Sequence, residues 1–181
     1  ATPIIIKMIM DNNENNDKPS AEAKLAAEAI ATNRNNPAYL MTLKFLAGIV
    51  SDSSDNVAIG RFWQAVSCNL DGVIELGVQE KVKLFMHLLG QSKVKGTFDE
   101  RIPNLKEIQK FIDDNIEKQN LSHWQDEIIT SGYLSANIIG KIKKLIDSAD
   151  KASQEEQGEI KAAFDLVQKL INDQQVLDNI G

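Results

Sequence analysis

The sequence contains few of the residues that carry metal, redox or nucleophilic chemistry. Its 181 residues include one cysteine, Cys68, and two histidines, His87 and His123. One cysteine cannot form a disulfide within the chain, and no Cys-x-x-Cys, His-x-x-x-His or Glu-x-x-His spacing is present. Glycine-rich phosphate loops and the Gly-x-Ser-x-Gly elbow are also missing. We therefore predict no catalytic residues, no metal ligands and no cofactor, and we expect that the protein is not an enzyme.

Long apolar runs and an excess of positive charge are missing too. The longest apolar run, from Pro3 to Met10, is interrupted by Lys7 and is shorter than the ~18 residues that cross a bilayer. The net charge of −6 argues against nucleic acid as a partner, because phosphates are bound mainly by Lys and Arg. A short basic cluster at Lys141–Lys144 has acidic neighbours, which is typical of a solvated helix face. We expect neither a transmembrane segment nor nucleic-acid binding.

Apolar residues are nevertheless plentiful, at 43% of the chain, and a chain of this length can bury a substantial core. From Ser20 onward they recur at the i, i+3, i+4, i+7 spacing of amphipathic helices. The expected fold is all-α, a single compact bundle of about seven or eight amphipathic helices. The predicted helices cover residues 21–33, 37–51, 56–69, 78–89, 105–116, 123–131, 134–147 and 154–173.

Local signals predict where several helices begin and end. We expect Gly90 to end the helix over 78–89 in the left-handed conformation, and residues 91–101 to form a polar loop. In a capping box, a Ser side chain and a Glu or Gln three residues later satisfy each other's backbone N–H groups. Two such boxes are predicted, Ser122 with Gln125 and Ser153 with Glu156.

The N-terminal residues differ from the rest of the chain. Residues 1–10 are apolar and β-branched and predict a short extended arm, which an Asn-rich linker joins to the helical part. Residues 11–22 resemble an EF-hand calcium loop in their oxygen-bearing side chains, but Asn16 replaces the required glycine and Pro19 interrupts the loop, so a solvated linker is favoured. We predict an arm and linker over 1–19 and a helical domain over 20–181. The start at Ala1 rather than methionine favours a processed or secreted product.

The sparse aromatic residues are the remaining candidates for a binding site. Met41 and Met86 suit either an adaptable apolar site or gaps in a core. For the aromatic residues, Tyr39 and Phe45 included, core packing is favoured, and the alternative is that they line an apolar pocket or a groove for a partner. The residues predicted to contact a partner or ligand are Phe62, Trp63, Phe85 and Trp124.

Two functions fit these features. The favoured one is a non-catalytic helical binding protein that acts through a protein–protein interaction surface, which predicts an exposed apolar patch. The alternative is a secreted carrier of a hydrophobic small molecule such as a lipid, held in a helical cavity. This alternative rests on the helix over 78–89, which is apolar on more than one side, and it predicts an enclosed cavity of roughly 300–1,000 Å³. The sequence leaves the oligomeric state open.

Overall fold

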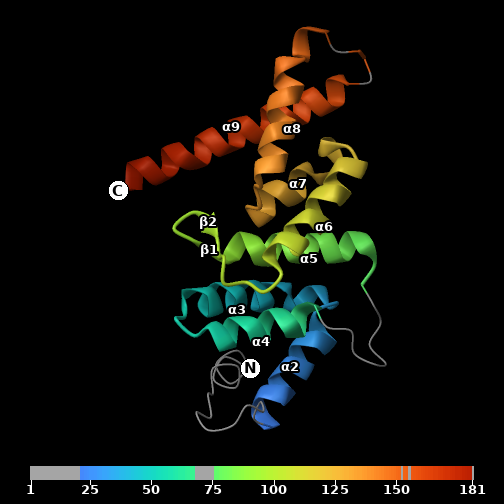
Figure 1. Cartoon of the computed structure of the whole chain (residues 1–181). Helices are drawn as coiled ribbons and strands as arrows, with labels where there is room; N and C mark the ends of the chain where they lie inside the picture. The colour runs from blue at the N-terminus through green and yellow to red at the C-terminus, as the bar shows by residue number, and fades with distance from the viewer. Residues whose placement is uncertain (1–20, 68–75, 152, 155, 181) are drawn as a thin grey trace. The chain divides into compact units, whose positions relative to one another are not determined.

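The computed structural model describes residues 21–67, 76–151, 153–154 and 156–180 (Figure 1). The predicted N-terminal arm and linker, with most of the calcium-like loop, lie outside these residues, as does Cys68. The described residues contain eight α-helices, two short 3-10 helices and one two-stranded sheet. The prediction of an all-α fold is therefore confirmed.

The elements follow the predicted order, and contacts group them into two compact units, Ala1–Ile108 and Gln109–Gly181, so that α6 contributes to both. The expectation of one domain over 20–181 stays a prediction. The elements are α2 (Ala21–Asn33), η1 (Pro37–Tyr39), α3 (Leu40–Asp52), α4 (Asn56–Ser67), α5 (Val78–Gln91), β1 (Lys93–Val94), β2 (Thr97–Phe98), α6 (Leu105–Lys118), α7 (Leu121–Ser131), α8 (Ala136–Asp147), η2 (Ala149–Lys151) and α9 (Gln157–Ile180).

In the first unit, α3 and α4 each pack on two other α-helices. Helix α2 packs on α4, and α3 packs on both α4 and α5. The Trp63 ring lies edge-on to Phe62, with 5.9 Å between centroids, and 6.5 Å from Phe85. As predicted, α5 is apolar on more than one side; its buried residues are Val82, Leu84, Phe85, Met86, His87, Leu88 and Leu89.

Arginine side chains from elsewhere in the chain bind the last carbonyl groups of two helices in this unit. The Arg101 guanidinium donates to the carbonyls of Ser51 and Ser53 at the end of α3, the latter at 2.6 Å, and the buried Asp99 carboxylate holds it in place at 2.9 Å. Arg34, which follows α2, donates to the Val66 carbonyl at the end of α4 at 2.7 Å. Positive charge is favourable at a helix C-terminus, where unpaired carbonyls carry partial negative charge.

The end of α5 differs from the prediction. Gly90 does not end the helix, which continues to Gln91, and the Ser92 N–H bonds the Leu88 and Leu89 carbonyls. The segment beyond it is not a plain loop, because β1 and β2 pair antiparallel around a two-residue turn. Lys95 and Gly96 have φ of 51° and 83°, and positive φ at both central residues is typical of the tight type I′ hairpin turn.

In the second unit, α9 packs on α7 and α8. One half of the capping box predicted before α9 is present, since the Glu156 carboxylate accepts from the Ser153 N–H at 2.8 Å and from its hydroxyl at 2.9 Å. The other half differs, because the Glu156 N–H bonds the Ser153 backbone carbonyl, at 3.1 Å, and not its side chain. The left-handed glycine cap predicted for Gly90 occurs instead at Gly132, which has φ of 67° and ends α7.

The capping box predicted for Ser122 and Gln125 is wrong, because the acceptor at the start of α7 comes from α9. The Glu159 carboxylate accepts from the N–H groups of Leu121 and Ser122, the latter at 3.0 Å, and from the Ser122 hydroxyl at 2.5 Å. Burial alone would raise the pKa of Glu159, but these hydrogen bonds and the charge of Lys141 outweigh it and lower the pKa. A carboxylate is therefore held ionised at a helix N-terminus, where negative charge is favourable.

We predict that Glu159→Gln lowers the free energy of unfolding by about 1–2 kcal/mol at neutral pH, the usual cost of losing a helix cap. The native pKa of Glu159 lies below its ordinary value of 4.5, so the stabilisation is present above that value and is lost as the pH falls through the native pKa. Urea unfolding across the acid range checks both points. Glu117→Gln, at an exposed site on α6, is the control and should change stability by less than about 0.5 kcal/mol.

Candidate functional site

The four residues predicted to bind a partner or ligand lie in the protein core. Phe62, Trp63 and Phe85 belong to the first unit and Trp124 belongs to the second, so the structure groups only the first three. Each exposes 4% or less of its surface. A role for these residues in binding stays a prediction, and as folded they offer almost no surface to a partner.

One of the four, Phe85, lines a small pocket. The pocket has a volume of about 90 Å³ and is shared with Arg34 and Lys81, whose ammonium lies 5.8 Å from the centre of the Phe85 ring. This volume is several times smaller than the roughly 300 Å³ at which sites for small organic ligands begin. The pocket is too small to hold a lipid chain.

Other apolar residues of the first unit are exposed. Met41 and Phe45 lie one turn apart on α3 and expose 70% and 59% of their surface, and Tyr39 just before α3 exposes 40%. We call Met41 and Phe45 the α3 face. Met86, the other methionine of the predicted apolar site, is fully buried in α5.

The α3 face lies on the side of its helix that points away from the core. The buried residues of α3 follow the i, i+3, i+4, i+7 spacing, and Met41 and Phe45 fall roughly opposite that stripe. In the sequence, Phe45 looks like part of one broad apolar stripe with Leu43 and Leu46, but the structure exposes it. The angle of each residue around the helix is the sequence signal that separates the buried side of α3 from its exposed side. The buried residues are Leu43, Leu46, Ala47, Val50 and Ser51.

A second exposed apolar group lies on α9. Phe164, Leu170 and Ile171 expose between 43% and 50% of their surface. The side of α9 that packs on α7 and α8 is formed by other residues, including Ala163 and Leu166. We call the three exposed residues the α9 face.

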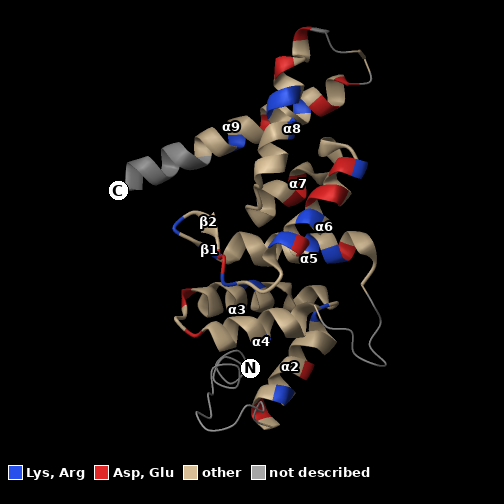
Figure 2. Ribbon diagram, viewed as in Figure 1, with Lys and Arg blue, Asp and Glu red and all other residues tan. Residues whose placement is uncertain are grey.

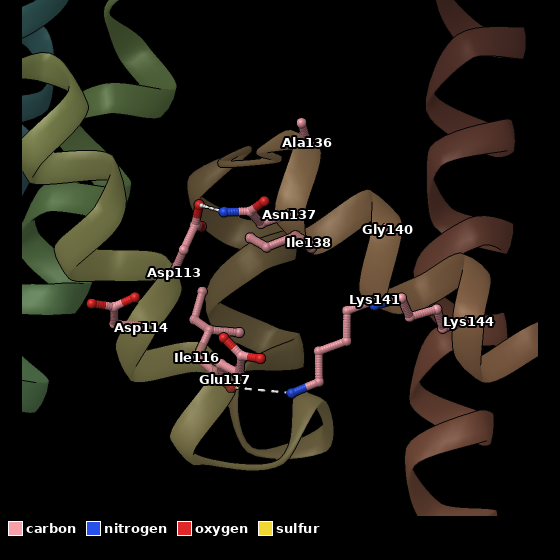
Figure 3. Close-up of a pocket in the computed structure, with 10 residues that line it drawn as sticks. All are labelled: Asp113, Asp114, Ile116, Glu117, Ala136, Asn137, Ile138, Gly140, Lys141 and Lys144. Atoms are coloured by element: carbon pink, nitrogen blue, oxygen red, sulfur yellow. Dashed lines mark hydrogen bonds between the residues drawn. The ribbon is translucent and has the colours of Figure 1, made fainter.

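A groove in the second unit lies between α6 and α8 (Figure 3). It has a volume of about 460 Å³ and is open to solvent. The wall from α6 is acidic, whereas that from α8 carries lysines, which are drawn in blue in Figure 2. The lining residues are Asp113, Asp114, Ile116, Glu117, Ala136, Asn137, Ile138, Gly140, Lys141 and Lys144.

Asp113 joins the two walls at one end of the groove. Its carboxylate accepts from the Ser135 hydroxyl and from the Asn137 amide, both at 2.8 Å, and more weakly from the Tyr133 hydroxyl at 3.5 Å. Burial raises the pKa of Asp113, and the hydrogen bonds oppose this shift without cancelling it. Burial and the charge of Asp113 in turn raise the pKa of Tyr133, which keeps its hydroxyl protonated.

Lys141 joins the walls at the other end. The basic cluster was predicted to be a solvated face, and Lys143 and Lys144 are indeed exposed. Lys141 is instead partly buried, and its ammonium donates to the Ile116 and Gln119 carbonyls at 3.2 Å each. These carbonyls belong to the C-terminal end of α6, so Lys141 acts as a cap for that helix.

Among the described residues, no group of three His, Cys, Asp or Glu side chains is arranged to hold a metal ion. In the same part of the chain, none of the helices combines the length and the apolar character needed to cross a bilayer. Comparison with known proteins adds no relative: no protein-family model, no curated protein and no solved structure matches the chain.

We predict that Asp113→Ala costs about 1–3 kcal/mol of stability, because the buried donors at Ser135 and Tyr133 lose their acceptor. Asp113→Asn keeps one acceptor oxygen and should cost less. Since the native pKa of Asp113 is raised, the native state binds its proton more tightly than the unfolded state does, and wild type gains stability relative to Asp113→Asn as the pH falls. Urea unfolding at several pH values checks the sign, which is opposite to that for Glu159.

We also predict that Gly140→Ala raises the free energy of unfolding by about 0.5–1 kcal/mol, the cost of glycine inside a helix. A methyl group added at Gly140 meets no other atom within 4 Å, so nothing offsets this gain. Thermal unfolding measures the change. A destabilised Gly140→Ala variant would show that the glycine is required for packing.

Proposed function

We propose that this protein is a non-catalytic helical module that binds a protein partner through the α3 face. The observation that carries the proposal is the exposure of Met41 and Phe45, side by side on the outer side of α3. Phe62, Trp63 and Phe85, which the sequence predicted to bind a partner, then act as core residues of the same unit, and Trp124 is a core residue of the second unit.

Folding leaves much of the apolar surface of Met41 and Phe45 in contact with water. Removing a Met or Phe side chain from water contributes roughly 1.5–3 kcal/mol, so a partner that covers both residues gains appreciable binding energy. Two anchors at i and i+4 on a helix are a common arrangement for contacts with an apolar groove. The flexible Met41 side chain also adapts to partners of different shape.

The expectation that the protein is not an enzyme stays a prediction, which rests on the sequence and its two histidines. His87 is buried in α5, and His123 lies on α7 against Trp124, with 5.1 Å between ring centroids. The carrier of a hydrophobic molecule has less support, because the pocket beside Phe85 holds only about 90 Å³ and the larger groove is open and charged.

Two matched double variants of the full chain test the proposal. Met41→Ser with Phe45→Ser removes the α3 face, and Phe164→Ser with Ile171→Ser removes the α9 face. Each pair exchanges exposed side chains and should change stability by less than about 0.5 kcal/mol per site, which circular dichroism verifies. Each variant and the wild type are then used to capture proteins from an extract of the source cells, with quantification by mass spectrometry.

We expect that wild type and the α9-face variant capture the same protein in similar amounts. The amount captured by the α3-face variant should be at least several-fold lower. Retention by all three proteins, or loss only with the α9-face variant, would contradict the assignment to the α3 face. Capture of no protein by the wild type would contradict the function itself.

A further inference from the structure

Gly140 has no packing reason to be a glycine. It lies in the middle of α8, where glycine is less favourable than alanine, and a Cβ built at this position meets nothing within 4 Å. It does line the groove between α6 and α8, as Figure 3 shows. The lack of a side chain leaves the groove open beside this residue.

The groove is held in its shape before any ligand arrives. Asp113 bonds Ser135 and Asn137 across one end, and Lys141 bonds the Ile116 and Gln119 carbonyls across the other. Figure 3 shows one contact of each kind as dashed lines. A preformed site loses less conformational freedom when a ligand binds, which favours affinity.

Charged groups remain on both walls after these bonds are made. Asp114 and Glu117 on α6 and Lys144 on α8 have no hydrogen-bond or ion-pair partner among the described residues, and all three are exposed. Ile116 and Ile138, which are largely buried, and the exposed Ala136 also line the groove. The groove thus offers negative charge on one wall, positive charge on the other and some apolar lining.

We propose that this groove binds a small zwitterion that carries an ammonium group and a carboxylate separated by a short apolar chain. The ammonium group pairs with Glu117, the carboxylate pairs with Lys144, and the apolar chain lies along the groove between them. Its volume of about 460 Å³ falls within the range of roughly 300–1,000 Å³ that small-molecule sites occupy. This site lies in the second unit and is independent of the proposed protein-binding function.

Three matched probes test the proposal by NMR titration of the full chain. ε-Aminocaproate carries both charges on an apolar chain, hexylamine carries only the cation and caproate carries only the anion. We expect saturable shifts of the backbone amides of α6 and α8 with ε-aminocaproate, at a dissociation constant on the order of millimolar, as befits a small ligand in an open site. Each single-charge probe should bind roughly two- to fivefold more weakly, the contribution of one exposed ion pair.

The variants separate the two charges. Glu117→Gln should weaken binding of ε-aminocaproate and hexylamine but leave caproate unchanged, whereas Lys144→Gln should weaken ε-aminocaproate and caproate but leave hexylamine unchanged. Gly140→Leu should abolish the shifts by filling the groove, and Gly140→Ala, which adds only a methyl group, should retain them in part. The α3-face variant is the control, and its groove should bind like that of wild type.

Several results would overturn the proposal. They are the absence of saturable shifts in α6 and α8 at millimolar ε-aminocaproate, equal binding of all three probes, and shifts that persist unchanged in Gly140→Leu. Because the groove and the α3 face are altered by different substitutions, failure here leaves the capture experiment unaffected.

Discussion

The structure depends on charged side chains that reach from one segment to the end of another helix. Helix ends leave backbone N–H and C=O groups without partners, and these groups carry partial charges of opposite sign at the two ends. Arg34 and Arg101 bind carbonyls at the ends of α4 and α3. Lys141 does the same for α6, and Glu159 binds the first N–H groups of α7. In every case the sign of the charge is the one that the helix end favours.

The last two of these contacts meet at the corner between α6 and α7. Lys141 binds backbone carbonyls of the residues before the corner, and Glu159 binds N–H groups of the residues after it. Since these side chains come from α8 and α9, the corner is fixed only when the later helices are in place. The same Lys141 contact closes one end of the groove, so the shape of the candidate ligand site is a consequence of how the helices are capped. The α3 face caps no helix end, and its apolar residues are exposed, as the proposed binding function requires.

The helices were predictable because their apolar residues repeat with the helical period, and the local Ser153–Glu156 cap was predictable because both partners are three residues apart. The cap of α7 was not, because Glu159 lies 37 residues from Ser122 and no local pattern connects them. Gly90 was assigned as a helix end from residue type alone, although the packing of α5 carries the helix past it. The hairpin at Lys93–Phe98 does show a short alternation of polar and apolar residues on either side of Gly96, which is typical of strands.

For the candidate site, residue type was a poor guide. Large aromatic rings are the strongest contributors to a core as well as to an interface, and Phe62, Trp63, Phe85 and Trp124 all entered the core. The exposed residues, Met41 and Phe45, were distinguishable only by their angle around α3. The groove requires α6 and α8 to lie side by side, and no pattern within either helix predicts this.

Hydrogen exchange of the Leu121 and Ser122 amides tests most directly whether capping from a distant helix holds the second unit together. These amides donate to Glu159 in the native structure. Exchange in wild type should be slow, and Glu159→Gln should accelerate it by about tenfold, the factor expected for ~1.4 kcal/mol, while amides of α5 in the first unit keep their rates. Equal exchange of Leu121 and Ser122 in the two proteins would contradict the account.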